Sequence, residues 1–210
     1  MELNALSLDQ FIEKISSMAP APGGGSVSGY AGAMGAALLA MVAGLTLGRE
    51  KYKEHEDLAK EILEKTSGLT ASLLNAVEED ARAYGAVSEA FALPKSTDAE
   101  KAERSIAVER ALKEAVRPPL DVMQLCRAAL ESAEKMVGRS NVNAASDLGV
   151  AALNLKAAVQ GAWLNVLTNL ASLDDKAFAD DCRQRGAGIV EYCEGAADRI
   201  YNKVQQGLKG

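Results

Sequence analysis

Hydrophobic residues recur along this chain at intervals of three and four, which is the spacing of an amphipathic α-helix. No segment shows the alternation of Val, Ile or Thr with polar residues that marks a half-buried β-strand. The pattern therefore predicts an all-α protein. It predicts a short helix that begins after Ser7 and longer helices over residues 26–48, 54–92, 97–116, 118–137, 144–171 and 172 to near the C-terminus.

Local signals mark the expected helix boundaries. Pro94 disfavours helical geometry at Leu93 and predicts the end of the third helix, in which Gly68 is a second candidate break. Pro118 and Pro119 suit the first turn of the fifth helix. Three pairs have the spacing of a capping box, whose two side chains satisfy backbone N–H groups at a helix start. These pairs are Ser7 with Gln10, Thr97 with Glu100, and Ser172 with Asp175.

Composition agrees with closely packed helices. The 210 residues are 48% hydrophobic but only 4% aromatic, so the core is expected to consist mainly of Ala, Leu, Val and Gly. A chain of this length can bury a substantial core. It contains no internal repeat and no linker long enough to separate two domains. We therefore expect one domain over residues 1–210, a helical bundle with long central helices that forms a homodimer.

Charge and cysteine content exclude several classes of protein. The formal net charge is −6 at pH 7 and no long basic run occurs, which argues against nucleic acid or an anionic membrane surface as the main partner. The three cysteines and the single histidine lack metal-ligand spacing, so no metal site is expected. The N-terminal residues lack the basic and apolar regions of a signal peptide. A cytoplasmic protein is expected.

One stretch resembles a membrane span. Residues 15–48 contain no charged side chain and are long enough to cross a bilayer. Pro20, Pro22 and the glycines at 23–25 interrupt the stretch, and the rest is mostly Ala and Gly, which is weakly hydrophobic for lipid. We interpret the stretch as the buried central helix of a soluble protein, with a transmembrane helix as the alternative.

This central helix has two different faces at 100° per residue. Small residues on one face let another backbone approach closely, either within the bundle or in a second subunit. Large residues on the other face are expected to lie in a core. The small face consists of Gly29, Ala33, Ala36, Ala40, Ala43 and Gly44, and the large face of Met34, Leu38, Met41 and Leu45.

Asp80 is the first candidate for chemistry. It fills a gap in an apolar stripe on the third predicted helix, formed by Leu69, Leu73, Ala76, Tyr84, Val87 and Phe91. Desolvation on such a face raises the pKa of a carboxyl group, which suits a general acid or base. The alternative is an aspartate paired with a neighbouring helix or placed at the exposed edge of the stripe.

The sixth predicted helix carries an unusual polar stripe. Lys156 lies on the opposite side and is expected to mark the solvent face, so the stripe is expected to face inward. Buried amides need hydrogen-bond partners, either other helices or a polar heterocycle such as a pterin. The stripe consists of Asn143, Asp147, Asn154, Asn165 and Asn169.

A glycine-rich loop over residues 20–26 precedes the second predicted helix. Glycines before a helix N-terminus expose backbone N–H groups that can bind an anion or a carbonyl group. The spacing fits neither a phosphate-binding P-loop nor a dinucleotide-binding loop. Such a turn is common, so this signal alone is weak.

Taken in order, these segments resemble the cyclodeaminase/cyclohydrolase family, which comprises the C-terminal domain of formiminotransferase-cyclodeaminase and stand-alone methenyltetrahydrofolate cyclohydrolases. The resemblance extends over essentially the whole chain. The motifs are Pro22-Gly23-Gly24-Gly25-Ser26, Met34-Gly35-Ala36-Ala37, Met41-Val42, Leu45-Thr46, Tyr52 after Arg49 and Lys51, Asp80, Leu93-Pro94-Lys95 with Thr97, Pro119-Leu120, Asn141, Ser146-Asp147, Asn165-Val166 and Asn169.

The resemblance implies an all-helical dimer with a folate site near the subunit interface. It implies that Asp80 is catalytic. Ser140 stands where the family usually has glycine, which changes the turn before Asn141. We further expect Arg49, Lys51 and Lys53, together with Lys95, to hold the glutamate carboxylates of the substrate. The implied substrate-binding residues are Pro22, Gly23, Gly24, Gly25, Ser26, Thr46, Lys95, Asn141, Ser146, Asp147, Asn165 and Asn169.

The family's two activities share a tetrahedral carbon between N5 and N10 of tetrahydrofolate. One is hydrolysis of 5,10-methenyltetrahydrofolate to 10-formyltetrahydrofolate, and the other is cyclisation of 5-formimidoyltetrahydrofolate with release of ammonia. The sequence contains no formiminotransferase domain to supply the second substrate, so we expect hydrolysis. A helical interaction protein without activity is the weaker alternative. No cofactor is expected, because the folate is the substrate.

Overall fold

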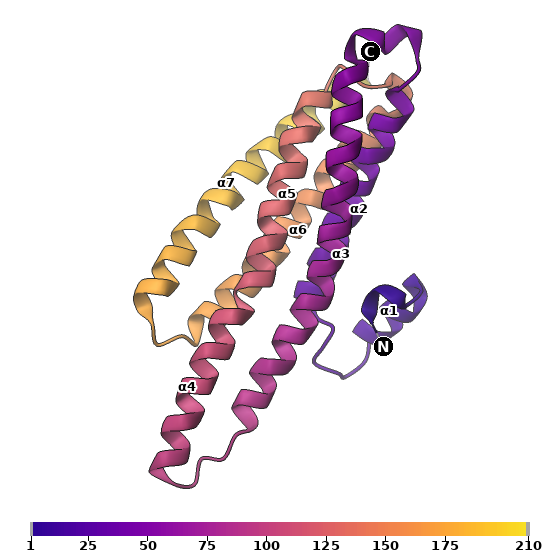
Figure 1. Cartoon of the computed structure of the whole chain (residues 1–210). Helices are drawn as coiled ribbons and strands as arrows, with labels where there is room; N and C mark the ends of the chain where they lie inside the picture. Colours follow the sequence, from indigo (N-terminus) through magenta and orange to yellow (C-terminus); the bar gives the residue numbers. More distant parts are fainter. Residues whose placement is uncertain (1, 209–210) are drawn as a thin grey trace.

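The fold is an antiparallel bundle of long helices (Figure 1), seen in a computed structural model that describes residues 2–208. The described residues contain no β-strand, so the prediction of an all-α fold is confirmed. The α-helices are α1 (Leu8–Ile15), α2 (Gly24–Thr46), α3 (Glu56–Ala92), α4 (Asp98–Ala115), α5 (Arg117–Met136), α6 (Ala145–Ala171) and α7 (Lys176–Gly207). Three 3-10 helices are η1 (Leu3–Ala5), η2 (Glu50–His55) and η3 (Val142–Ala144).

Helix α2 is the centre of the bundle and packs against α3, α5 and α6. It runs antiparallel to α6, since Gly24 lies beside Asn165 at one end and Leu45 accepts a hydrogen bond from Asn141 at the other. Helices α4 and α5 form one nearly continuous column in Figure 1, and the α3–α4 hairpin extends beyond the rest of the bundle. The pocket described below lies where this hairpin leaves the bundle.

The small face of α2 packs within the bundle, which is one of the two uses expected for it, whereas the expectation that the large face lies in a core is wrong for most of its residues. The small face packs inside the chain: a Cβ at Gly29 would lie 2.7 Å from Val77 Cγ2 of α3, and Ala33, Ala36 and Ala43 are buried. Most of the large face lies outside the core, because Met34 is 50% exposed and Met41 is 41% exposed, and only Leu38 packs against the core. Close helix packing thus selects the small residues for the interior.

Most predicted helix boundaries are close to those observed. The capping boxes at Ser7 and Thr97 are confirmed. The predicted break at Gly68 is wrong, because α3 continues through it. The predicted cap at Ser172 is also wrong: Asp175 is the N-cap of α7 and accepts a hydrogen bond from the Phe178 backbone.

Helix α2 is long and apolar enough to cross a membrane by length and composition. Half of its most apolar 18-residue window is buried inside the structure. Helix α2 also packs against α3, α5 and α6, and the core helix of a soluble protein passes the same test of length and composition.

Candidate active site

A pocket of about 340 Å³ lies between the loop before α2, the middle of α3, the end of α4 and the end of α6. Of the residues implicated by sequence, the structure places Gly23, Gly24, Gly25, Asp80, Asn165 and Asn169 in its lining. The described residues contain no group of three His, Cys, Asp or Glu side chains arranged to hold a metal ion. The polar side chains of the lining are the Asp80 carboxylate, the Asn165 and Asn169 amides and the hydroxyl groups of Tyr84, Thr168 and Ser172.

Asp80 is half-buried at the base of the pocket. Its Oδ2 accepts a hydrogen bond of 3.0 Å from Ser26 Oγ. Burial raises the pKa of Asp80 above the usual value of an aspartate, and hydrogen bonds from the Ser26 hydroxyl and backbone offset part of the rise. A carboxyl group of this kind exchanges protons more readily near neutral pH than an exposed aspartate does.

The start of α2 is built around this carboxylate. The N-cap residue Gly23 offers no side chain to the first turn, and the Asp80 carboxylate from α3 takes that place through its bonds to Ser26. A Cβ at Gly25 would overlap the Asp80 carboxyl group. The glycine-rich loop thus allows the carboxylate and the backbone of α2 to approach, and Pro22 adjoins it after a cis peptide bond.

Asn169 is oriented by a backbone carbonyl of another helix that has no partner within its own helix. In a continuous helix the N–H of residue 119 would bond to the carbonyl of Ala115. Pro119 has no N–H, and Asn169 Nδ2 donates to the Ala115 oxygen instead, at 2.8 Å. The two prolines predicted to start α5 therefore also orient a side chain in the pocket.

Asn165 lies one turn before Asn169 on α6. Its Nδ2 donates to the Gly161 carbonyl at 2.8 Å, and a Cβ at Gly24 would lie 3.4 Å from the same nitrogen. The side chain is therefore fixed against both α6 and the first residue of α2. Gly24, like Gly25, leaves room for a polar group of the pocket.

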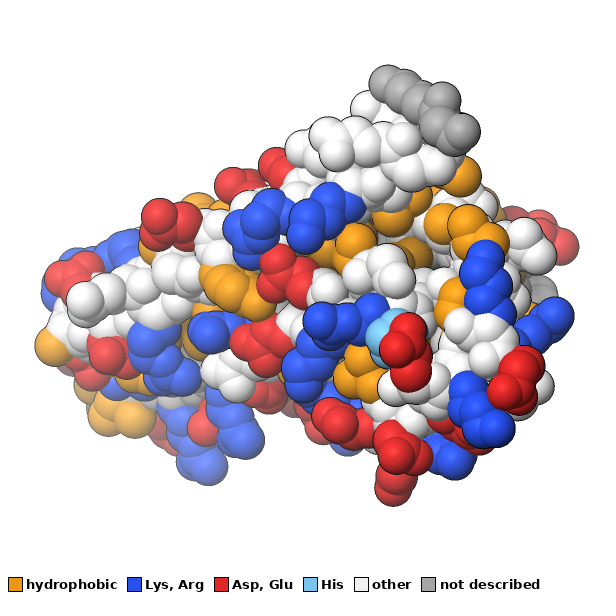
Figure 2. Space-filling view, turned by 90° about the horizontal axis from the view of Figure 1, so that it is seen from above, with side chains coloured by type: hydrophobic (Ala, Val, Ile, Leu, Met, Phe, Trp, Pro, Cys, Tyr) orange, Lys and Arg blue, Asp and Glu red, His pale blue; other side chains and the backbone are white. Residues whose placement is uncertain are grey.

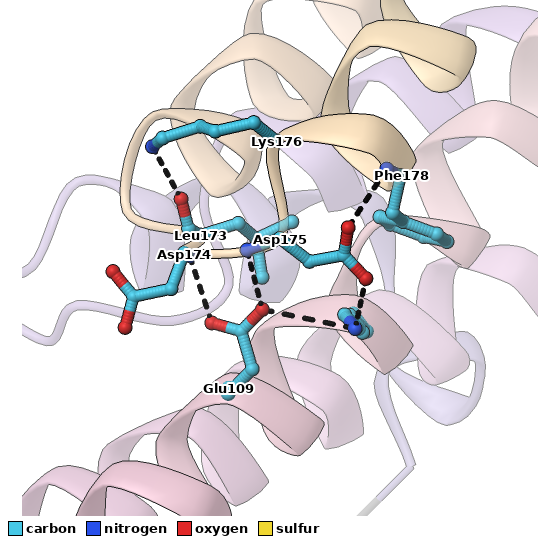
Figure 3. Close-up of polar contacts among 7 residues, drawn as sticks. Glu109, Leu173, Asp174, Asp175, Lys176 and Phe178 are labelled. Atoms are coloured by element: carbon cyan, nitrogen blue, oxygen red, sulfur yellow. Dashed lines mark hydrogen bonds and ion pairs between the residues drawn. The ribbon is translucent and has the colours of Figure 1, made fainter.

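A polar cluster keeps α4 against the end of α6 (Figure 3). Glu109 accepts hydrogen bonds from the backbone N–H groups of Asp174 and Asp175, at 2.9 and 3.0 Å, and Lys113 pairs with Asp175 at 2.7 Å. The bonds from the backbone of Asp174 lower the pKa of Glu109, and the bond from Lys113 lowers the pKa of Asp175. This cluster fixes the wall that Leu112 and Ala115 contribute to the pocket.

A second group of the implicated residues lies at the opposite end of α2. Thr46 Oγ1 accepts a hydrogen bond from the Asn141 backbone at 3.0 Å, and Asn141 Nδ2 donates to Leu45 O at 3.0 Å. Thr46 is 1% exposed and Asn141 is 6% exposed. Both side chains join the end of α2 to the turn before α6, and along the helix Thr46 is about 31 Å from Gly25.

Ser146 and Asp147 lie in the first turn of α6, close in sequence to Asn141. Ser146 is exposed and Asp147 is half-buried. Within one chain, neither can reach the Asp80 pocket at the far end of α6. The polar stripe thus extends along α6, with Asp147 at its start and Asn154 near its middle, and only Asn165 and Asn169 lie at the pocket.

The expected solvent face of α6 is also corrected. Lys156 is half-buried and forms a 2.6 Å ion pair with Asp198 of α7. Its side of α6 faces α7 rather than open solvent. The expectation was wrong because a sequence pattern does not show which helix covers a given face.

The predicted basic cluster is not a single cluster within one chain. Lys95 is exposed in the α3–α4 loop, about 18 Å or more along α3 from Asp80. Arg49, Lys51 and Lys53 lie at the other end of α3, where Figure 2 shows Lys and Arg side chains mixed with Asp and Glu. The two parts lie at opposite ends of a 37-residue helix.

Sequence reasoning missed several lining residues. Thr168 and Ser172 line the pocket together with the two asparagines. Each lies three residues after an asparagine on the same helix, so helical spacing from Asn165 and Asn169 was the signal that could have found them. Tyr84, identified only as a member of the apolar stripe, is 43% exposed and also lines the pocket.

Together, the fold and the pocket define an all-α protein with a desolvated carboxylate facing two fixed carboxamides. The chain belongs to the formiminotransferase-cyclodeaminase family, whose model matches residues 7–187. This finding confirms the family resemblance read from the motifs and makes the chain a member of an enzyme family.

Three relatives show the range of the family. The chain is 40% identical to a methenyltetrahydrofolate cyclohydrolase of Methylorubrum extorquens, over 95% of this chain and 96% of the relative. It is 31% identical to the formimidoyltransferase-cyclodeaminase of Mus musculus, of which it spans 37%. A crystal structure of formiminotetrahydrofolate cyclodeaminase from Thermotoga maritima superposes with a TM-score of 0.82 at 31% identity, covering 100% of this chain and 98% of that one.

Proposed function

We propose that this protein hydrolyses 5,10-methenyltetrahydrofolate to 10-formyltetrahydrofolate, with Asp80 as the general acid/base. The observation that carries the proposal is the Asp80 carboxyl group, which lies half-buried in the lining of the pocket and has a raised pKa. The near full-length similarity to a protein named methenyltetrahydrofolate cyclohydrolase supports this choice of substrate.

In this mechanism the Asp80 carboxylate takes a proton from water as the water oxygen adds to the carbon between N5 and N10. The resulting tetrahedral carbon, which now carries a hydroxyl group, loses its bond to N5, and the protonated Asp80 returns the proton to that nitrogen. The hydroxyl oxygen becomes the formyl C=O oxygen as its own proton is released to solvent. A single well-placed carboxyl group can serve both steps because each transfer restores it for the other. The reaction requires no cofactor, and Asn165 and Asn169 orient the nitrogen-rich ring system.

Cyclisation of 5-formimidoyltetrahydrofolate is the second candidate, favoured by the structural similarity to a protein named formiminotetrahydrofolate cyclodeaminase. Both reactions need a proton shuttle at the same carbon. Parallel assays with each substrate distinguish them: faster turnover of the methenyl compound supports hydrolysis, and faster release of ammonia from the formimidoyl compound overturns it.

The proposed enzyme is a soluble, cytoplasmic homodimer, and an apolar surface supports the dimer. Large side chains are exposed along the outer faces of α2 and α6, which lie side by side. Exposed apolar side chains gathered on neighbouring helices are typical of a protein interface. It consists of Val27, Met34, Met41 and Leu45 of α2, and Val150, Leu153 and Leu164 of α6; we call it the α2/α6 face.

A two-fold axis across the middle of α2 would make the active site composite. It would place the Thr46 end of one copy beside the Asp80 pocket of the other, because the partner helices would run antiparallel. Asp147 and the basic residues near Arg49 would then reach the substrate from the second copy. This arrangement accounts for implicated residues that lie about 31 Å apart along α2 in one chain.

Mixing two inactive variants tests this arrangement. Asp80→Asn and Asp147→Ala damage different parts of a composite site, so a mixed dimer contains one intact site and one doubly damaged site. Co-refolding equal amounts should restore about a quarter of wild-type activity, since half of the dimers are mixed. Activity no greater than the mean of the two variants would show that each site is formed by one chain.

A further inference from the structure

The N-terminal segment of the chain is fastened to α2 and α3 by one set of hydrogen bonds. The Asn4 backbone N–H donates to Glu78 Oε1 of α3 at 2.7 Å, and Asn4 Nδ2 donates to the Leu74 carbonyl at 2.9 Å. The Tyr30 hydroxyl of α2 shares its proton between Leu3 O, at 3.0 Å, and Asn4 Oδ1, at 3.2 Å. We call these contacts of Asn4, Tyr30 and Glu78 the N-terminal latch.

Helix α1 is held through the same tyrosine. Phe11 is the one buried residue of α1, and its ring meets the Tyr30 ring edge to face, with 4.5 Å between the centroids. Burial, and next the charge of Glu78, raise the pKa of Tyr30, so its hydroxyl remains a donor at neutral pH. Figure 1 shows α1 at the side of the bundle, joined to α2 by a loop. The latch and the aromatic contact thus fix the point from which this loop starts.

The loop over residues 16–23 contributes to the wall of the pocket. Pro20 and Ala21 of this loop are in the lining. The loop is fixed at its C-terminal end by the bond from Ser26 to Asp80 in the first turn of α2, and at its N-terminal end by α1 and the latch. A loop fixed at both ends has fewer conformations to lose when a ligand binds against it.

Both ends of the loop are fastened by the same two helices. Ser26 and Tyr30 are one turn apart on α2, and Asp80 and Glu78 are two residues apart on α3. On the basis of the proposed function, we infer that Tyr30 and Glu78 are positioning residues, which hold the N-terminal segment so that the loop before α2 is preset for the folate. Neither residue lines the pocket, so both act through the loop.

Hydrogen exchange of the ligand-free protein tests the coupling between latch and loop. Tyr30→Phe removes the hydroxyl and keeps the ring, and Glu78→Ala removes the acceptor of the Asn4 N–H. Each variant should speed exchange of the backbone amides of residues 16–27 about two- to tenfold, the effect of one lost hydrogen bond. Faster exchange confined to residues 3–15, or no change in either segment, would overturn the inference.

Two controls separate the latch from a general loss of stability. Tyr192→Phe also removes a tyrosine hydroxyl bond between helices, to Glu134, but Tyr192 lies outside the pocket on α7. It should leave the exchange of residues 16–27 unchanged, and an effect equal to that of Tyr30→Phe would count against the latch. Glu78→Gln keeps an acceptor oxygen and should exchange like the wild type, whereas a rate equal to that of Glu78→Ala would remove Glu78 from the latch.

Steady-state kinetics tests whether the preset loop matters for the substrate. In Tyr30→Phe and Glu78→Ala, KM for methenyltetrahydrofolate should rise by the same factor as the exchange rate, while kcat stays within about twofold of wild type, because the latch does not touch the reacting atoms. An unchanged KM beside faster loop exchange would overturn the positioning role. A wild-type protein without turnover would reject the proposed reaction alone, since the exchange experiment decides the latch without a substrate.

Discussion

At the scale of single residues, the site depends on placing one carboxyl group where water solvates it poorly. Asp80 gains two hydrogen bonds from Ser26, yet burial still raises its pKa. The carboxylate is therefore less stable in the fold than in the unfolded chain. A residue kept for proton transfer at the expense of stability is a common property of active sites.

Replacing Asp80 with asparagine should raise stability at neutral pH. A raised folded-state pKa contributes stability below the unfolded-state value, near 3.9, and that contribution is lost as the pH rises through the folded-state pKa. Asp80→Asn removes the ionisation, so its Tm should exceed that of the wild type at pH 7 and approach it near pH 4. Thermal unfolding over this pH range measures the difference. The difference in Tm between variant and wild type should therefore grow from pH 4 to pH 7. A difference that shrinks or becomes negative over this range would contradict the burial argument.

At the scale of helices, the pocket depends on interruptions in regular structure. Pro119 separates α4 from α5 and leaves the Ala115 carbonyl to Asn169. The cluster of Glu109, Lys113 and Asp175 then holds α4 beside the end of α6 (Figure 3). Side-chain orientation in the pocket is thus set by helix ends rather than by the loops alone.

The variant Pro119→Ala tests this coupling. Alanine supplies the missing N–H to the Ala115 carbonyl, so Asn169 loses its exclusive partner while the helix is retained. We expect an unchanged or higher Tm and a KM for the folate raised about fivefold, which corresponds to roughly 1 kcal/mol for one hydrogen bond. Steady-state kinetics measures KM. Asn169→Ala should give a similar increase, and an unchanged KM in both variants would remove Asn169 from substrate binding.

The sequence was informative where local chemistry decides structure. The capping boxes at Ser7 and Thr97 and the prolines of α5 act within a few residues, so the helix boundaries they predict agree with the fold. The large face of α2 was wrongly expected to lie in a core, because helical periodicity separates two faces but does not say which neighbour covers each. That only part of the α6 stripe lies at the pocket was missed for the same reason: positions on one face can lie at opposite ends of a 27-residue helix.

The candidate site was predictable in part. Periodicity alone distinguished Asp80, because a carboxylate on an apolar stripe is unusual within a single helix. The bond between Asn169 and Ala115 joins residues 54 positions apart in sequence. No local pattern contains such a contact, and the family resemblance named Asn169 without giving the reason for its orientation.

At the scale of the whole molecule, the α2/α6 face links the fold to the proposed composite site. Met41 is 41% exposed in one chain and would be covered in the dimer. Met41→Glu should therefore leave the chain folded but place a charge in the interface, giving a monomer with little activity. Ile106→Glu is the control, because Ile106 is 72% exposed on α4, outside this face. Light scattering and activity assays should separate the two variants, and a fully active Met41→Glu monomer would refute the composite site.

The rate of methenyltetrahydrofolate hydrolysis by Asp80→Asn tests the central claim most directly. Asparagine keeps the shape of the side chain but cannot transfer a proton, so kcat should fall by about 10²–10⁴ with the fold intact. Glu79→Gln is the control, since Glu79 is an exposed neighbour on α3; Glu78 is unsuitable because it accepts a 2.7 Å bond from Asn4. The loss of methenyl absorbance is corrected for spontaneous hydrolysis. An Asp80→Asn enzyme within about threefold of wild type would contradict the assignment of Asp80 as the proton-transferring residue.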